Sequence, residues 1–284
     1  MTVLDLSPLR LAPEHIPAAL MLSAEPGWNQ IAEDWAWMIG HGEAFGLSTP
    51  AGRLIASGLT VVYDQAPFAW ISMILVTADF RRKGLATRLM QRCSEAIERR
   101  GLVPALDASP EGRQVYLKLG FNDFYRTSRF LVERPPAAGR PAGLRPLQAD
   151  DLARITAFDR RHAGGDRSTL LRHLQQRLPA AAWLAEQDGK ITGYALGREG
   201  RLCPQLGPVV AEDEATALAL LEAAGAALGR PFCIDAGDHH AGLAAWLKRQ
   251  RAQFITPFVR MLKGRDRPYD DPAKIFVIAG PELG

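Results

Sequence analysis

The 284-residue sequence contains only three cysteines, Cys93, Cys203 and Cys233, and no C-x-x-C pair. An odd and widely spaced set argues against a disulfide framework and against a zinc site, so we expect a reducing compartment and no bound metal. Apolar runs of the roughly 18 residues that a membrane-spanning helix needs are absent. The amino-terminal residues also lack the basic and then apolar pattern of a signal peptide. These absences predict a soluble, cytoplasmic protein without membrane contacts.

Long blocks of one charge are absent as well. The net charge is +3, and the basic residues occur in short groups with acidic residues between them. No group reaches the roughly five or six like charges of a nucleic-acid-binding tail, so we expect no nucleic-acid partner. The composition, 47% hydrophobic and 23% charged, is ordinary for a globular protein. The length corresponds to about two domains.

A boundary between two domains is indicated by the segment 133–143, ERPPAAGRPAG. It is rich in Pro, Gly and Ala and has no apolar periodicity. We therefore expect an amino-terminal domain over residues 1–134, a linker over 135–143 and a carboxyl-terminal domain over 144–284.

The two expected domains also echo each other. Five short matches occur in the same order, with offsets between 128 and 137 residues. They pair the segment at Leu9 with that at Leu144, Gly52 with Gly189, Val76 with Val209, Asp107 with Asp235, and Tyr116 with Trp246. Each match is weak alone, but five in order indicate a duplicated domain.

The first half is typical of an α/β (α+β) domain with a mixed, mostly antiparallel sheet. Alternating and β-branched runs predict strands over 3–11, 44–49, 53–63, 68–76, 103–108 and 124–133. Apolar residues at helical spacing predict helices over 13–24, 30–40, 84–100 and 111–120. The tail, 274–284, is strand-like to its end, and we expect it to dock on the protein.

The most informative stretch is WISMILVTADFRRKGLATRLM, residues 70–90. An apolar strand runs into a basic turn, Arg81-Arg82-Lys83, and a helix begins after Gly84. Main-chain N–H groups at a helix N-terminus favour phosphate oxygens, and a glycine lets a pyrophosphate approach the backbone. The alternative is a basic turn that caps an ordinary amphipathic helix.

This stretch resembles the signature V-x-P-x-x-[RQ]-x-x-G-x-[GA] of the GNAT superfamily of acyl-CoA-dependent N-acyltransferases. Val76, Arg81, Gly84 and Ala86 fit it, and Ala78 stands where proline is usual. The resemblance implies acetyl-CoA as cosubstrate, with its pantetheine arm along the strand and its pyrophosphate in the turn. The residues so assigned are Ile74, Leu75, Val76, Arg81, Arg82, Lys83, Gly84, Leu85, Ala86 and Thr87.

A second element of that family, N-x-x-A-x-x-x-Y-x-x-x-G-F, resembles SPEGRQVYLKLGF at 109–121. Tyr116 matches, while Ser109 and Gly112 replace the Asn and the Ala. The resemblance implies that Ser109 lies at the cofactor and that the Tyr116 hydroxyl protonates the departing CoA thiolate, a step worth roughly 10²–10⁴ in rate. The alternative is a tyrosine that only packs in the core.

The implied reaction is direct attack of an amine on the thioester, with a main-chain N–H of the 70–76 strand steadying the oxyanion. The base is left open. Candidates are a water held by Ser72, the carboxylates of Asp107, Asp34 and Glu282, and the terminal carboxylate of Gly284, which some tandem GNAT proteins use.

The acceptor is expected near EPGWNQIAEDWAW, residues 25–37, because GNAT domains place it against the early helices. Trp28, Asn29 and Asp34 are the candidate substrate-binding residues, and Glu25 is a further partner for a cationic amine. The alternative is a tryptophan-rich core patch, which we favour for Trp35 and Trp37.

The second half departs from the motif. Its equivalent turn reads VVAEDEATALALL, with no glycine and no basic residue, and Trp246 stands in place of Tyr116. We expect a degenerate GNAT-like domain that completes the acceptor cleft or stabilises the first domain. His239 and His240 are adjacent and cannot share one helical face, so we expect no metal there.

The sequence therefore predicts a tandem GNAT protein whose first half moves an acetyl group to a primary amine of a small molecule. A non-catalytic acyl-CoA sensor or scaffold is the alternative, and a homo-oligomer is possible. The acceptor and the length of the acyl chain stay open.

Overall fold

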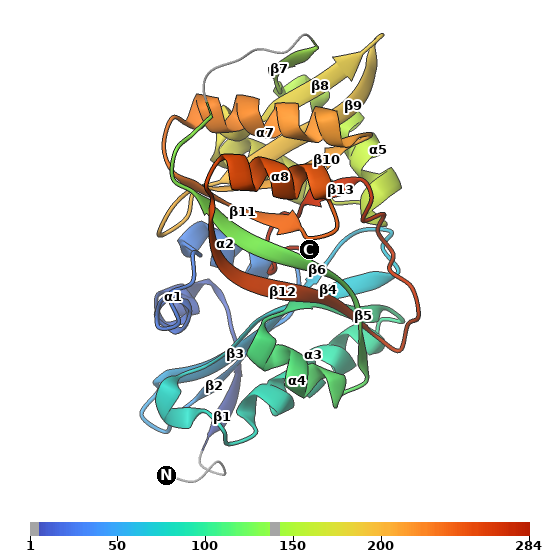
Figure 1. Ribbon diagram of the computed structural model, residues 1–284. Coiled ribbons are helices and arrows are strands. Elements are labelled where there is room, and N and C mark those ends of the chain that lie inside the picture. The colour runs from blue at the N-terminus through green and yellow to red at the C-terminus, as the bar shows by residue number, and fades with distance from the viewer. Residues whose placement is uncertain (1–5, 137–142) are drawn as a thin grey trace.

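The computed structural model describes residues 6–136 and 143–284 (Figure 1). The first half contains β1 (Ser7–Arg10), η2 (Pro13–His15), α1 (Ile16–Ala24), α2 (Ala32–Gly40), β2 (Ala44–Ser48), β3 (Leu54–Val62), β4 (Phe68–Val76), η3 (Ala78–Phe80), α3 (Leu85–Glu98), β5 (Val103–Ala108), α4 (Pro110–Leu117) and β6 (Phe121–Val132). The second half contains β7 (Leu144–Pro146), η4 (Ala149–Asp151), α5 (Leu152–Ala163), α6 (Ser168–Arg177), η5 (Pro179–Ala181), β8 (Trp183–Gln187), β9 (Lys190–Arg198), β10 (Gln205–Ala211), α7 (Glu214–Leu228), β11 (Phe232–Gly237), α8 (Ala241–Arg249), β12 (Gln253–Lys263) and β13 (Ile275–Val277).

The strands of the two halves form one continuous sheet. Its order is β1-β2-β3-β4-β5-β12-β6-β11-β13-β10-β9-β8-β7, and the pairs are antiparallel except β4–β5 and β10–β11. This confirms the expected mixed and mostly antiparallel architecture.

The halves exchange a strand at the centre of the sheet. β12, from the second half, lies between β5 and β6 of the first half, and β6 lies between β12 and β11 (Figure 1). The pairing of β6 with β12 runs from Phe121 to Leu131, so this strand begins three residues before the range 124–133 predicted from the sequence. The sheet therefore couples the two halves through its own hydrogen bonds.

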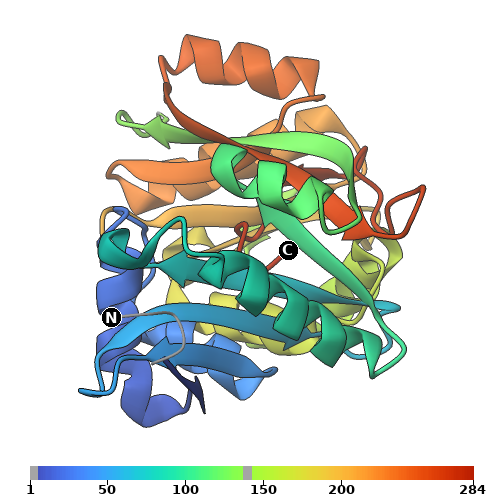
Figure 2. The ribbon, with the colours of Figure 1, turned by 90° about the horizontal axis from the view of Figure 1, so that it is seen from below.

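Helices cover both faces of the sheet in three apolar clusters. One cluster packs α3 and α4 on the first half, and another packs α7 and α8 on the second half. The third is shared: residues of α1 and α2 pack with residues of α5 and α6 between the halves. In both views the C-terminal residues lie near the middle of the molecule (Figures 1 and 2).

The C-terminal tail docks as expected, but only Ile275–Val277 is strand. The prediction of a strand to the end of the sequence was wrong, because Pro281 has no N–H to donate and Gly280 has a φ of +139°. Residues 278–284 turn inward instead, and Leu283 is 3% exposed. Most of the expected linker, 137–142, lies outside the described residues. Among the described helices none is long and apolar enough to cross a bilayer.

Candidate active site

The strands β4 and β5 separate beyond their first residues. They pair in parallel only from Phe68 to Trp70, opposite Val103 to Ala105. Further along, β5 pairs with β12 on its other side, and the structure gives β4 no strand partner on its β5 side from Ile71 to Val76. A strand with unpaired N–H and C=O groups accepts an extended ligand as an added strand. The predicted cofactor-binding residues Ile74, Leu75 and Val76 lie along this opening.

A bulge interrupts β4 in the middle of the opening. The register with β3 passes from Leu59–Ser72 to Ser57–Leu75, so β4 has one residue more than its partner. Met73 adopts a φ of +52°, and its carbonyl accepts a hydrogen bond of 2.8 Å from the hydroxyl of Ser57. A bulge leaves its extra residue outside the ladder. Met73 therefore lies between the two registers and has no paired partner on β3.

The opening leads from β4 to the N-terminus of α3. Gly84 begins the helix with a φ of +77°, where a side chain would add strain, and the space above it is open. The first intrahelical hydrogen bond runs from the N–H of Arg88 to the carbonyl of Gly84. The N–H groups of residues 85–87 thus have no partner inside the helix and, with its dipole, favour an anion.

The basic turn before α3 is exposed to solvent, and among its three basic side chains that of Arg81 is bound to neighbouring groups. Arg81, Arg82 and Lys83 are all exposed, as a site for a phosphate from solvent requires. The Nε of Arg81 donates to the carbonyl of Val76 at 3.0 Å, and Nη2 lies 3.4 Å from the carboxylate of Glu25. Glu25 also accepts the N–H of Ala78 at 2.7 Å. Glu25, considered above as a partner for an amine, therefore contacts the turn.

Tyr116 lies between α4 and the sheet, next to α3. Its ring packs 6.2 Å from that of Phe121, and 9% of the residue is exposed. Burial raises the pKa of its hydroxyl above the ordinary value, so the group keeps its proton at neutral pH. Ser109 begins the same helix, and its hydroxyl accepts the N–H of Gly112 at 3.2 Å. The hydroxyl of Ser109 thus serves as a helix cap in this structure.

In the second half the equivalent opening is filled by the chain itself. β10 and β11 pair only at Gln205–Cys233, and beyond that point β13 inserts between them, with Val277 opposite both Val209 and Ala236. A Cβ on Gly207 would lie 2.3 Å from the carbonyl oxygen of Ile278, so the glycine permits this approach.

The helices α7 and α8 of the second half also bind each other through their side chains. The carboxylate of Glu214 reaches from α7 to the first turn of α8 and accepts the N–H of Leu243 at 2.9 Å. Trp246, the counterpart of Tyr116, is fully buried, and its indole N–H donates to Glu222 at 3.0 Å. These contacts give a physical reason for the expected loss of acyl-CoA binding in this half.

Two of the predicted acceptor residues, Asn29 and Trp28, form hydrogen bonds with the loop 201–203 of the second half. The amide oxygen of Asn29 accepts the N–H groups of Leu202 and Cys203, and its amide nitrogen donates to the carbonyl of Cys203. A Cβ on Gly200 would lie 2.2 Å from Asn29, so the loop closes tightly over the amide. Trp28 is half-buried, and its carbonyl accepts a bond from Arg201.

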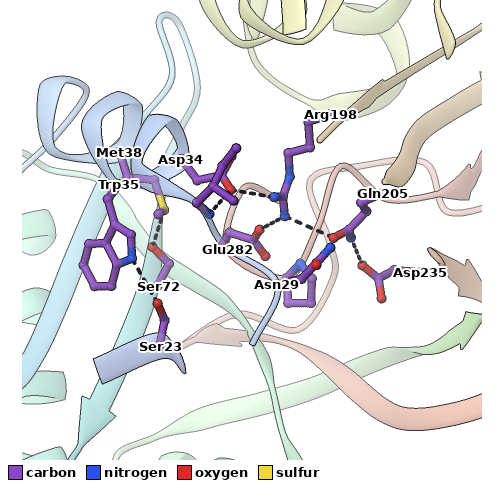
Figure 3. Close-up of polar contacts among 12 residues, drawn as sticks. Ser23, Asn29, Asp34, Trp35, Met38, Ser72, Arg198, Gln205, Asp235 and Glu282 are labelled. Carbon is purple, nitrogen blue, oxygen red and sulfur yellow. Dashed lines mark hydrogen bonds and ion pairs between the residues drawn. The ribbon is translucent and has the colours of Figure 1, made fainter. Parts of the chain in front are cut away.

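Asp34 lies in a buried network of charges (Figure 3). Its carboxylate accepts hydrogen bonds from the guanidinium of Arg177 at 2.8 Å, from that of Arg198 at 2.7 Å and from the main-chain N–H of Ile31 at 2.9 Å. Arg198 also donates to Glu282 in the tail and to Gln205. The carboxylate of Asp34 is thus saturated by the protein, and we place no amine against it.

The other candidate bases occupy different environments. Ser72 is buried, and its hydroxyl lies 3.7 Å from the sulfur of Met38 (Figure 3). Asp107 is buried and receives two hydrogen bonds from Arg260, at 3.0 and 2.9 Å; burial nevertheless raises the pKa of its carboxyl. Glu282 is paired with Arg198, as described above. Gly284 lies against the ring of Trp70, and its main-chain oxygen accepts a 2.7 Å bond from Arg167.

The described residues contain no group of three or more His, Cys, Asp or Glu side chains that could hold a metal ion. The histidine pair is engaged by main-chain oxygens: His239 lies 2.7 Å from the carbonyl of Pro272, and His240 lies 3.1 Å from that of Ile275.

Comparison with protein families gives two matches along the chain. Residues 28–130 and residues 155–277 each match a model described as an acetyltransferase (GNAT) domain. The uncharacterized N-acetyltransferase YitH of Bacillus subtilis is 25% identical over 83% of this chain and 83% of its own length. A holothin acyltransferase of a Pseudoalteromonas species is 27% identical over 90% of this chain and 91% of its own length.

Solved structures share the whole architecture. A structure from Pyrococcus horikoshii assigned as an acetyltransferase superposes with a TM-score of 0.81, covering 100% of this chain and 98% of that one at 21% identity. A tandem GNAT protein from the clavulanic acid biosynthesis pathway superposes with a TM-score of 0.67, covering 92% of this chain and 100% of that one at 14% identity. At such identities the likeness concerns the fold.

Proposed function

Since the chain belongs to the GNAT superfamily as a tandem, two-domain member, we propose that its first half transfers an acetyl group from acetyl-CoA to a primary amine of a small molecule. Membership of the family supports acyl transfer from an acyl-CoA. The observation that carries the proposal is the opening between β4 and β5, which ends at the anion-binding N-terminus of α3. The filled opening of the second half supports one cofactor site per chain.

In this proposal the pantetheine arm lies along Ile74 to Val76 and the pyrophosphate lies over Gly84 to Thr87. The charges of Arg82 and Lys83, both exposed, add attraction for phosphate. The thioester then lies near the bulge at Met73, where N–H groups outside the ladder stabilise the oxyanion.

The chemistry balances without a covalent enzyme intermediate. The amine nitrogen forms a bond with the thioester carbon, and the oxyanion collapses as the carbon–sulfur bond breaks. Tyr116 gives its proton to the CoA thiolate, the attacking nitrogen releases one proton to solvent water, and a proton from solvent restores the Tyr116 hydroxyl, so the net products are the amide and free CoA. The raised pKa of the Tyr116 hydroxyl keeps this donor protonated.

A small-molecule acceptor is supported by one of the relatives. The holothin acyltransferase is named for a small-molecule substrate, and it matches this chain over nearly its whole length. The saturated carboxylate of Asp34 and the engaged amide of Asn29 support an acceptor site elsewhere in the cleft.

The test is amine-dependent release of free CoA thiol from acetyl-CoA, with CoA binding measured by calorimetry on the same sample. We expect binding, and release with at least one class of amine. Tyr116→Phe should lower kcat by about 10²-fold or more while leaving CoA affinity unchanged. An acyl-CoA sensor would bind CoA, release no thiol with any amine and be insensitive to Tyr116→Phe.

A further inference from the structure

The turn 78–84, between β4 and α3, has a strained backbone. Arg82 adopts a φ of +60°, and Gly84 follows with a φ of +77°. A residue other than glycine rarely adopts such a φ, and the conformation persists only where neighbouring contacts hold it. In the proposed function this turn binds the pyrophosphate of the cofactor. The contacts that hold the turn therefore bear on cofactor affinity.

The backbone before the turn has the conformation that precedes a proline. Thr77 has a φ of −59° and a ψ of 150°, and the residue before a proline is restricted to extended angles of this kind. Ala78 then begins the 3₁₀ helix Ala78–Phe80, in which φ matches the value that a proline ring imposes. The family pattern that the sequence resembles has proline at this position. Alanine keeps the same turn but adds an N–H group and lacks the ring that fixes φ.

The carboxylate of Glu25 binds this additional N–H group. Its Oε1 accepts the main-chain N–H of Ala78 at 2.7 Å and lies 3.4 Å from Nη2 of Arg81. The Nε of Arg81 donates in turn to the carbonyl of Val76 at 3.0 Å. Hydrogen bonds to an ionised acceptor are stronger than those between neutral groups. One oxygen of Glu25 thus contacts the start of the turn and also the residue before the strained Arg82.

Glu25 is itself held in place by the core of the first half. It is the C-cap residue of α1, and its N–H donates to the carbonyl of Met21 at 3.1 Å. Leu22 of the same helix is 3% exposed and belongs to the apolar cluster that also contains Leu75 of β4. The helix that carries Glu25 is therefore packed against the strand that leads into the turn, and the carboxylate is a fixed anchor.

The negative charge of Glu25 has the opposite effect on a phosphate. A carboxylate near the pyrophosphate repels it, although Arg81 offsets part of that charge. A glutamate that acted only through its charge would weaken CoA binding, so removing it would lower the Kd. A glutamate that holds the turn would raise the Kd when removed. The direction of the change separates the two roles.

We propose that Glu25 is a positioning residue of the cofactor site, whose carboxylate replaces the missing proline ring and holds the turn 78–84 in the shape that binds the pyrophosphate. This inference rests on the proposed acyl transfer. It adds to the cofactor site a residue that lies outside the sequence motif, 53 positions before Ala78.

The experiment measures the Kd of CoA by calorimetry for Glu25→Ala, Glu25→Gln and the control Glu33→Ala. Glu33 is exposed in the first turn of α2, so its removal changes the net charge equally. We expect Glu25→Ala to raise the Kd about fivefold, the scale of one partly exposed hydrogen bond to a charged group. Glu25→Gln keeps an oxygen for the N–H of Ala78 and should stay within about twofold of the wild type. Glu33→Ala should leave the Kd unchanged.

A proline at position 78 provides a rescue. In the Glu25→Ala background, Ala78→Pro supplies the ring and removes the N–H, so it should restore most of the lost affinity. In the wild-type background the same substitution brings a ring carbon against the carboxylate, whose oxygen lies 2.7 Å from the nitrogen of Ala78. There it should give no gain. A carboxylate that only stabilises α1 would not be replaced by this proline.

Turnover gives a second readout. With a reactive amine, Glu25→Ala should raise the KM for acetyl-CoA about fivefold and leave kcat nearly unchanged, because the lost contact affects binding and not the chemical step. With S-acetylpantetheine, which lacks the pyrophosphate, the variant should match the wild type. An equal loss with both acyl donors would overturn the role given to Glu25.

Two further results would overturn it while leaving acyl transfer intact. One is a Glu25→Ala variant that binds CoA as tightly as the wild type or more tightly. The other is a failure of Ala78→Pro to restore affinity in the Glu25→Ala background. Absence of CoA binding by the wild-type protein would instead refute the proposed function.

Discussion

Gly112 lies directly against Tyr116, the proposed proton donor. A Cβ at position 112 would lie 2.8 Å from the ring carbon Cε2 and 3.0 Å from the hydroxyl oxygen of Tyr116. The family pattern that the sequence resembles has alanine at this position. The glycine therefore permits the position that the Tyr116 hydroxyl takes in this protein.

Replacing this glycine should move the proton donor without unfolding the helix. Gly112→Ala should lower kcat about tenfold, because small displacements of a reacting group are costly, and alanine suits a helix better than glycine. CoA affinity measured by calorimetry should not change. In a Tyr116→Phe background the same substitution should cost nothing further, since the hydroxyl is already gone. Additive losses in kcat would contradict the role given to Tyr116.

Gly84 allows a matched test of the pyrophosphate turn. Gly84 and Gly52 both have a positive φ, +77° and +80°, and neither has an atom within 4 Å of an added Cβ. Alanine should cost each position about 1 kcal/mol of unfolding free energy from backbone strain. Only Gly84→Ala should also raise the Kd for CoA, by about tenfold, because only there would the methyl group meet the ligand. Equal effects of both variants on CoA binding would remove Gly84 from the site.

The local elements near the proposed cofactor site could be predicted from the sequence. Periodicity predicted the helix from 84 and the strand over 68–76, and both are present as α3 and β4. These elements depend on nearby residues, such as Gly84 at a helix start. The duplication could be predicted too, because the five short matches occur in the same order in both halves although each match is weak.

Contacts between distant segments could not be predicted in this way. The exchange of β12 into the first half depends on pairing such as Arg260 with Asp107, 153 residues apart. Asp34 and Asn29 were predicted as acceptor residues because GNAT domains place the acceptor against their early helices, but their partners Arg198 and Cys203 are in the other half. The close approach of Ile278 to Gly207 likewise joins segments that are far apart in the chain.

The network around Arg198 should contribute strongly to the stability of the whole chain. Arg198 is fully buried and bridges Asp34 in the first half with Glu282 in the tail. Arg198→Met preserves most of the volume but leaves buried carboxylates with less compensation, so we expect a loss of about 3 kcal/mol or more in urea unfolding.

The matched control is Arg230→Met. Arg230 pairs with Glu199 on the surface, where about half of each side chain is exposed, and such pairs contribute less than about 1 kcal/mol. If Arg198→Met proved as mild as Arg230→Met, the buried network would not contribute strongly to the stability of the chain.

His173 should make stability depend on pH in the acidic range. Its ring stacks 5.8 Å from that of Trp37, between the halves, and burial together with the Arg177 guanidinium lowers the pKa of His173 to about 4. The unfolded chain, with an ordinary pKa near 6.5, then binds one proton more than the folded chain between these values. Folding stability is therefore complete above about pH 6.5 and is lost as the pH falls toward 4.

His173→Gln removes this titration and keeps a side chain that can accept a hydrogen bond from Arg177. Near pH 5 the slope of unfolding free energy against pH should be smaller in the variant by about 1 kcal/mol per pH unit. That is less than the roughly 1.4 of a whole proton because the ring is only half-buried. The measurement is urea unfolding of both proteins from pH 4.5 to 8, where other titrating groups contribute equally and cancel. Parallel curves would mean that the imidazole takes up its proton as readily in the folded protein as in the unfolded chain.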